Sequence, residues 1–97
     1  MDKSKIIKAS ELFKVLGSET RLTILYLLKD QELNVSQIIE HLNLDQSLVS
    51  HQLKILKEHD LVRTTKSGKN VIYRVADSHI IEIYNQAIEH VSEDTYE

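Results

Sequence analysis

The chain has 97 residues, of which 41% are hydrophobic and 28% are charged, and its formal net charge is -3. This length suits one small domain over residues 1–97 and is too short for two hydrophobic cores or for most enzymes built on a large sheet. The sequence has no cysteine, which excludes disulfides and thiolate metal sites. It also has no apolar run of the ~20 residues that span a bilayer. We therefore expect a soluble, cytoplasmic protein that does not contact a membrane.

The charge is unevenly distributed along the chain. Residues 46–75 carry six Lys and Arg against two acidic residues, a net charge of +4, whereas residues 76–97 carry six acidic residues and no Lys or Arg. A basic middle segment indicates a surface that meets an anionic partner. The acidic end indicates a different role for the last segment.

The first third of the chain predicts two helices. Apolar residues recur at helical spacing from Lys5 to Leu16, and Gly17 follows where a helix end favours a residue that tolerates positive φ. Ser18 can cap a second helix, whose dense apolar stripe over residues 22–28 ends at a polar break.

Two further helices have clear start signals. Asn34 and Gln37 have the spacing of a capping box and open a short helix that runs through Leu42. Asp45 can cap another helix from residue 46 to about residue 59. The connection between them is two residues long, which is short enough for a helix-turn-helix.

The pattern changes from helical to extended after residue 60. Residues 61–66 and 70–75 are rich in β-branched and aromatic side chains, and the segment 67–69 between them contains Gly68, so they predict a hairpin. Asp77 then caps a last helix with one broad apolar face. The expected fold class is mainly α with a small β-hairpin, a winged helix-turn-helix whose second motif helix can enter the major groove.

Three runs of sequence stand out along the chain. They are Leu16-Gly17-Ser18-Glu19-Thr20-Arg21-Leu22, Gln46-Ser47-Leu48-Val49-Ser50-His51-Gln52-Leu53-Lys54 and Gly68-Lys69-Asn70-Val71-Ile72-Tyr73. These runs resemble the ArsR/SmtB family of bacterial metal-responsive repressors. The resemblance covers nearly the whole chain, and the middle run is the most specific, because it joins the helix-turn-helix register to a Gln-Ser-x-Val-Ser-His core.

The helix of residues 46–59 is the candidate DNA-reading element, with operator double-stranded DNA as the partner. Its polar side chains can donate to phosphates or read base edges, while Val49, Leu53 and Leu56 form its buried stripe. Three basic residues on or near the hairpin tip suit phosphate contacts. The alternative is a solvated helix face with solubilising lysines. The candidates are Gln46, Ser47, Ser50, His51, Lys54, Arg63, Lys66 and Lys69.

The last helix carries a possible metal site. Asp77 and His79 stand at its start, and His90 and Glu93 stand three residues apart near its end. His79 and His90 are about 16 Å apart along a helix, so they cannot share one metal ion held at about 2.0–2.2 Å. An antiparallel two-fold mate brings the first pair of one chain level with the second pair of the other, around an axis near residues 84–85. This arrangement predicts two equivalent metal sites per dimer.

The spacing of these four residues is similar to the ligand spacing in the inter-subunit site of SmtB-like zinc sensors. Two imidazoles and two carboxylates suit Zn(II), with Co(II) as its usual mimic, and are poorly matched to ions that prefer sulfur. The family's other common site needs cysteines, and the corresponding residues 32–36 contain none. In the family, the third ligand is linked by a hydrogen bond to the end of the recognition helix, which here implies His90 and the backbone near Asp60.

The apolar faces of the first and last helices exceed what a three-helix core with a wing can cover, which predicts a homodimer formed through these two helices. These faces comprise Ile6, Ile7 and Phe13 in the first helix, and Ile80, Ile81, Tyr84 and Ile88 in the last. Two remaining histidines, His41 and His59, fit no ligand pattern and are expected at the surface near helix ends.

The resemblance implies a repressor that binds operator DNA when metal-free and is released by Zn(II) or Co(II) across the dimer. Alternatives are a regulator of the same family that responds to another ligand, and a non-regulatory zinc-binding dimer. No enzyme constellation is found, because Ser50 and His51 are helix neighbours that point about 100° apart. Four protein ligands also leave no open position on zinc for a hydrolytic water.

Overall fold

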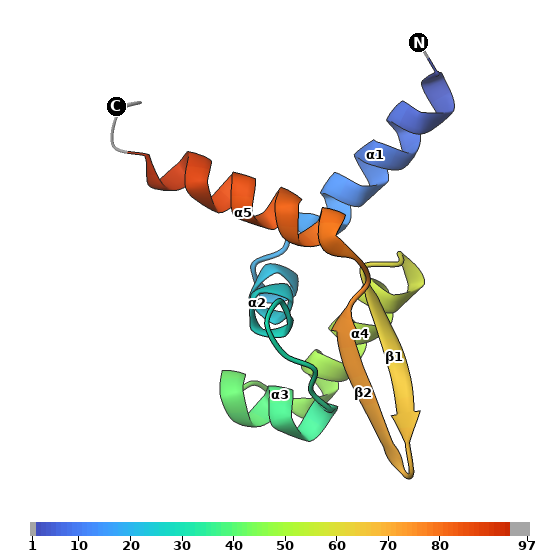
Figure 1. Cartoon of the computed structure of the whole chain (residues 1–97), viewed down its shortest axis with the longest axis vertical. Coiled ribbons are helices and arrows are strands. Elements are labelled where there is room, and N and C mark those ends of the chain that lie inside the picture. The colour runs from blue at the N-terminus through green and yellow to red at the C-terminus, as the bar shows by residue number, and fades with distance from the viewer. Residues whose placement is uncertain (1, 94–97) are drawn as a thin grey trace.

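The computed structural model of the chain describes residues 2–93, which form five helices and one hairpin. In chain order these elements are α1 (Lys3–Leu16), α2 (Glu19–Leu28), α3 (Val35–Leu42), α4 (Gln46–Glu58), β1 (Val62–Ser67), β2 (Asn70–Val75) and α5 (Ser78–Ser92). α2, α3, α4 and the hairpin form a body, from which α1 and α5 extend as diverging arms (Figure 1). The predicted winged helix-turn-helix is confirmed.

The helix starts follow from side-chain caps that the sequence predicts. The Ser18 hydroxyl accepts a hydrogen bond from the backbone N–H of Arg21 at 3.2 Å. Asn34 and Gln37 form a reciprocal capping box, with bonds of 2.8 and 2.9 Å. The Asp45 carboxylate caps α4 by accepting two backbone N–H bonds. Such caps satisfy N–H groups that have no partner within the helix.

α1 begins two residues earlier than predicted, because Asp2 provides a cap. Its carboxylate accepts bonds from the backbone N–H and the hydroxyl of Ser4, at 3.0 and 2.7 Å. These bonds lower the pKa of the Asp2 carboxyl, the hydroxyl bond most. His41 and His59 are exposed at the ends of α3 and α4, as predicted.

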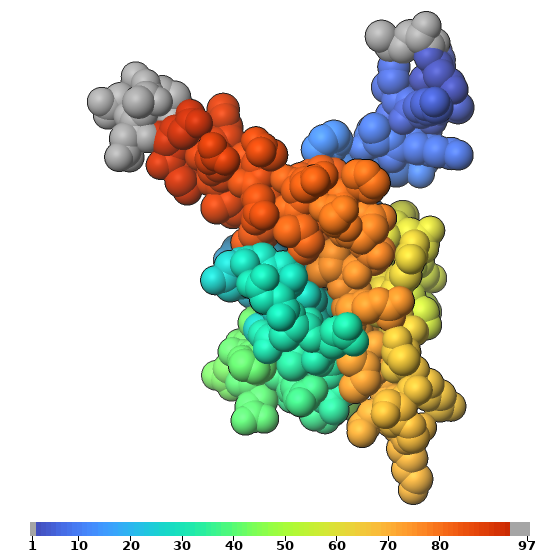
Figure 2. All heavy atoms as spheres, viewed as in Figure 1, coloured from blue at the N-terminus to red at the C-terminus, as the bar shows by residue number. Residues whose placement is uncertain are grey.

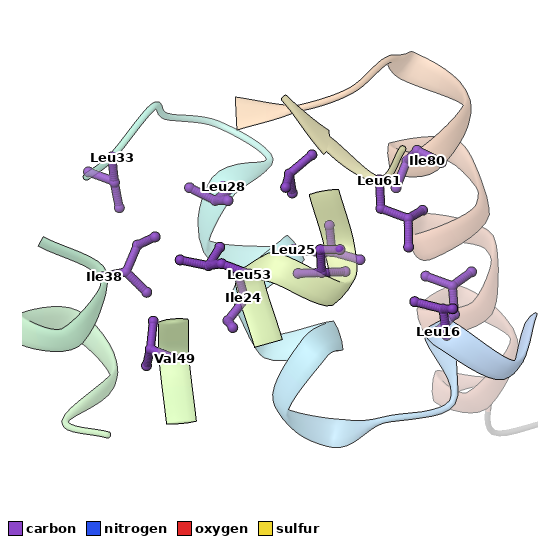
Figure 3. Packing of buried hydrophobic residues seen from close by; sticks show 13 residues of the cluster. Leu16, Ile24, Leu25, Leu28, Leu33, Ile38, Val49, Leu53, Leu61 and Ile80 are labelled. Atoms are coloured by element: carbon purple, nitrogen blue, oxygen red, sulfur yellow. The ribbon is translucent and has the colours of Figure 1, made fainter. Parts of the chain in front are cut away.

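Thirteen apolar residues form the core, where the five helices and the hairpin meet (Figure 3). The predicted stripe of Val49, Leu53 and Leu56 is fully buried. Ile80, which the sequence assigns to a dimer face, is instead only 7% exposed, because the first turn of α5 packs on this core. Between residues 2 and 93, no helix is long and apolar enough to cross a membrane.

The hairpin is antiparallel, with Val62 opposite Val75 at its base and Ser67 opposite Asn70 at its tip. Gly68 has a φ of 62°, which the tight turn requires and which glycine adopts without strain. The backbones of Leu33 and Tyr73 exchange two hydrogen bonds, of 3.1 and 2.8 Å. These bonds fix the wing to the α2–α3 connection.

Candidate functional site

The outer side of α4 carries the polar residues predicted to contact DNA. At 3.6 residues per turn, the five positions span an arc of about 140° on the helix surface, away from the buried stripe. All five side chains are exposed: Gln46, Ser47, Ser50, His51 and Lys54. The helix therefore presents donors and acceptors to a partner without disturbing the core.

α4 is tied to the rest of the body by a contact that the sequence analysis did not predict. The Nη1 group of Arg21 in α2 donates to Oε1 of Gln52 at 2.8 Å, and its Nε group donates to the carbonyl of Val15 at 2.6 Å. One guanidinium thus links the end of α1, the start of α2 and the middle of α4. Arg21 and Gln52 both lie in the runs that resemble the ArsR/SmtB family. That resemblance was the sequence signal that could have pointed to these two residues.

The wing places only two of its three candidate residues near the tip. Lys69 lies in the turn, Lys66 is opposite Val71, and both lysines are exposed. Arg63 lies at the base, opposite Arg74, so its predicted position near the tip is wrong. The register of the hairpin determines the position of Arg63, and sequence spacing alone did not define that register. The tip points away from the arms α1 and α5 (Figure 1).

The start of α5 brings two of the four proposed metal ligands together. The Asp77 carboxylate caps the helix by accepting the backbone N–H of His79 at 2.9 Å and that of Ile80 at 3.4 Å. The same oxygen, Oδ1, lies 3.3 Å from Nδ1 of His79. The edge of a zinc tetrahedron with bonds of 2.0–2.1 Å is about 3.3 Å, so these two atoms are spaced like neighbouring ligands.

The other two ligands lie at the opposite end of α5. Glu93 is the C-cap, one residue beyond the helix, and its backbone is extended, with φ -71° and ψ 129°. Eleven residues make about three turns, so His79 and His90 project from the same side. In the described part of one chain, no three His, Asp or Glu residues form a group that could hold a metal ion.

His90 borders an apolar hollow of about 460 Å³ between α1 and α5. The hollow is lined by Phe13, Glu82, Ile83, Gln86, Ala87 and His90. Phe13 is 62% exposed there, although an aromatic side chain is usually covered in a stable fold. Of the residues predicted to form a dimer face, Ile6, Ile7 and Ile88 are also exposed, whereas Ile81 and Tyr84 are half-buried.

The fold and the exposed polar helix define a winged helix-turn-helix regulator, and comparison with known proteins identifies its family. Residues 18–64 match the family model described as bacterial regulatory protein, arsR family. The transcriptional repressor SmtB homolog of Synechocystis sp. is 36% identical over 84 residues, covering 87% of this chain and 64% of that protein. The arsenical resistance operon repressor of Staphylococcus xylosus is 34% identical over 80 residues, covering 82% and 76%. The chain belongs to the ArsR family.

A solved structure agrees with this assignment. HlyU from Vibrio cholerae has a TM-score of 0.83 and 31% identity, covering 96% of this chain and 100% of that one. These relatives are transcription regulators rather than enzymes: two are named repressors, and HlyU is named a transcriptional activator. The chain spans 64% of the length of the SmtB relatives that it matches.

Proposed function

We propose that residues 1–97 act as one unit, a homodimeric repressor that binds operator DNA when metal-free and releases it when Zn(II) or Co(II) bridges the subunits. The proposal assigns Asp77 and His79 of one chain and His90 and Glu93 of the other to each metal ion. It assigns no catalytic role, since four protein ligands leave no position for a reacting water.

The observation that carries this proposal is the 3.3 Å spacing of Asp77 Oδ1 and His79 Nδ1. In the proposed dimer, these two atoms would form half of a tetrahedral site at one end of α5. His90 stands on the same side of the helix, three turns away, and Glu93 follows as the C-cap. A second α5 that lies antiparallel in the hollow beside His90 would supply the missing half at both ends.

The donor set favours Zn(II) and Co(II) over softer ions. Two imidazole nitrogens and two carboxylate oxygens are borderline to hard ligands, and the sequence has no thiolate to bind an ion that prefers sulfur. One relative is named for arsenical resistance. The chemistry of this chain nevertheless points to a different inducer. A bound ion would supply the charge that holds the four ligands together across the subunits.

The position of α5 supports a link between the proposed ligands and α4. The Ala76 N–H, next to Asp77, donates to the Leu61 carbonyl at 3.0 Å, and the Leu61 N–H donates to Leu56 of α4 at 2.8 Å. The start of α5 therefore adjoins the end of α4. In the antiparallel dimer, His90 lies by the partner's copy of this junction, so the relay from His90 to the backbone near Asp60 would run between subunits.

Zinc can lower the affinity for DNA only if it binds one arrangement of the dimer more tightly than another. We propose that the zinc-bridged dimer holds its two α4 helices in a spacing or stiffness that does not fit successive major grooves. Gln46, Ser47, Ser50 and His51 would read bases or position the helix, and Lys54, Arg63, Lys66 and Lys69 would contact phosphates.

A mixed dimer tests the shared site. One chain carries Asp77→Ala and the other carries His90→Ala, and zinc stoichiometry is measured for the mixed dimer and for each parent. Ligands drawn from both subunits leave one intact site in the mixed dimer, none in the parents and two in the wild-type dimer. A mixed dimer with no site or with two sites would contradict the arrangement.

One assay distinguishes the proposed repressor from the two alternative functions. Operator binding is measured with zinc and with a chelator. A non-regulatory zinc-binding dimer binds no operator in either condition. A family member that responds to another ligand binds the operator equally in both. The proposed repressor binds the operator more tightly when the chelator removes the metal.

A further inference from the structure

Arg21 joins three helices through one side chain. Its Nε group donates to the Val15 carbonyl of α1 at 2.6 Å, and its Nη1 group donates to Oε1 of Gln52 in α4 at 2.8 Å. Its backbone lies in the first turn of α2, where its N–H donates to the Ser18 hydroxyl at 3.2 Å. The side chain is therefore held at its base by α2 and at its head by α1 and α4.

The chemistry of this contact requires an arginine. A guanidinium is planar and carries its donors in a rigid fork, so Nε and Nη1 of Arg21 can serve two separate acceptors at once. Lysine has all its donors on one nitrogen and cannot reproduce that fork. Hydrogen bonds from a charged donor are also stronger than neutral ones. Arg21 and Gln52 are both half-buried, which limits the competition from water.

The acceptor on α1 lies where that helix is attached to the body. Val15 and Leu16, in the last turn, are the buried residues of α1. Figure 2 shows the rest of α1 standing clear of both the body and α5. Carbonyl groups in the last turn of a helix lack a partner within the helix, and a cation near them is favoured. The Arg21 guanidinium therefore anchors the attached end of α1.

The acceptor on α4 lies at the back of that helix. At 3.6 residues per turn, Gln52 is about 170° around the helix from the centre of the arc of polar side chains proposed to contact DNA. Within residues 2–93, its bond to Arg21 is the only side-chain hydrogen bond that joins α4 to another helix. A fixed point at the back of a helix limits its rotation about its own axis.

This rotation matters for reading bases. Apolar packing is non-directional, whereas a hydrogen bond weakens steeply when its donor and acceptor are misaligned. A rotation of α4 by about 20° would move a side-chain end about 6 Å from the axis by about 2 Å. A shift of this size exceeds the range of distances over which a side chain can hydrogen-bond to a base edge.

We propose that Arg21 is a positioning residue for DNA recognition, which acts through Gln52 to fix the rotation of α4 relative to the end of α1 and the start of α2. The inference rests on the proposed role of α4 in reading DNA. It is separate from the link at the end of α4, where the Leu61 N–H donates to Leu56. Because the guanidinium lies at the back of α4, its effect runs through Gln52 and not through a contact with DNA.

Paired substitutions at Gln52 test this role. Gln52→Met keeps the length of the side chain but removes the acceptor, whereas Gln52→Glu keeps an acceptor oxygen for Arg21. The probes are a duplex that the metal-free wild-type protein enriches from a random library and a scrambled duplex of the same length and composition. Both duplexes are titrated at one salt concentration.

The ratio of the two affinities is the readout. Gln52→Met is expected to lower this ratio about tenfold, which corresponds to about one lost base contact. Its affinity for the scrambled duplex should stay within about twofold of wild type, because phosphate contacts dominate that binding. Gln52→Glu is expected to keep the wild-type ratio.

Two further variants separate positioning from stability. Arg21→Lys keeps the charge but loses the fork, and it is expected to lower the ratio as Gln52→Met does. Ile24→Val, at a fully buried position of α2, is the matched control, because losing one buried methylene and losing one hydrogen bond destabilise a protein to a similar extent. It is expected to keep the ratio. Urea denaturation measures the stability of every variant.

Three results would overturn the role of Arg21. They are a wild-type ratio in both Gln52→Met and Arg21→Lys, an equal weakening on the two duplexes, or a fall in the ratio of Gln52→Glu as large as that of Gln52→Met. Each of them leaves the proposed function intact, since the wild-type protein still enriches a duplex. A wild-type protein that enriches no duplex would remove the proposed function, and this inference with it.

Discussion

α4 and α5 are both amphipathic helices, but their apolar sides are covered to different extents within one chain. The apolar stripe of α4 is fully buried within one chain, and the exposed side of its first two turns is polar apart from Leu48. α5 has only Ile80 buried, leaves Ile88 and Val91 exposed, and carries the four proposed metal ligands in two pairs at opposite ends. The apolar side of the proposed DNA-reading helix is therefore covered in a single chain. The proposed sensing helix would be completed by a second copy.

The largest expected effect comes from a substitution on the buried side of α4. Leu53→Ala removes a side chain with 0% exposure and is expected to lower the free energy of unfolding by about 2–5 kcal/mol, through reduced burial and the cavity left behind. Leu48→Ala, at a position 37% exposed on the same helix, is the matched control and should cost much less. Urea denaturation at one protein concentration measures both. Equal losses would mean that α4 is not anchored as described.

The next effect separates the two roles of Asp77. Asn is as good a helix cap as Asp, so Asp77→Asn should keep α5 folded, whereas Asp77→Ala should cost about 1 kcal/mol of stability. Both should weaken zinc binding by about 100-fold or more, since losing even an outer partner of a ligand costs 10–100-fold. Competition against a coloured chelator measures this affinity. Unchanged zinc affinity in both variants would remove Asp77 from the site.

A smaller effect tests which residues of α4 read sequence. Gln46→Ala or Ser50→Ala should reduce the discrimination between operator and random DNA by about 1–3 kcal/mol for each base that the side chain reads. The comparison is made at one salt concentration by titrating both DNAs. Equal weakening on operator and random DNA would show that these residues position the helix instead.

The smallest effect concerns the wing. Lys69→Ala should weaken binding to all sequences alike and reduce the slope of log affinity against log salt by about 0.9 for each phosphate that the lysine neutralises. Affinities at several salt concentrations give the slope. A variant that no longer binds the operator but still binds random DNA would make Lys69 a base-reading residue.

The parts of the fold with local signals were predictable. The capping box of Asn34 and Gln37, the caps at Ser18 and Asp45 and the glycine turn at Gly68 each depend on a few neighbouring residues, and the structure contains all four. Such signals are read directly from the chain because their partners lie within three or four positions.

The parts that depend on packing were predicted less well. Ile80 and Ile88 belong to the same predicted apolar face, yet Ile80 is buried in the core, with Ile83 packed against it, whereas Ile88 is exposed. The position of Arg63 at the base of the wing follows from the hairpin register, which local spacing does not define. The bond from Arg21 to Gln52 joins residues 31 positions apart, and no local pattern predicts such a contact. The positions of Asp77, His79, His90 and Glu93 at the two ends of α5 agree with the sequence analysis. A metal site made from them stays a prediction, because it would need a second chain.

The central claim is that a metal ion bridging two α5 helices controls the binding of α4 to DNA. The most direct test of this claim compares the operator affinity of the dimer with saturating Zn(II) and with a chelator. The affinity is measured for wild type, His90→Asn and Glu93→Gln. Wild type should bind more weakly with zinc by a factor within the usual range of about 5–150 for coupled sites. Glu93→Gln should keep this ratio once zinc is saturating, whereas zinc-loaded His90→Asn should lose it, because an imidazole has a second nitrogen to hold the protein. A wild-type ratio of one would contradict the account, and a full ratio in zinc-loaded His90→Asn would place the relay elsewhere.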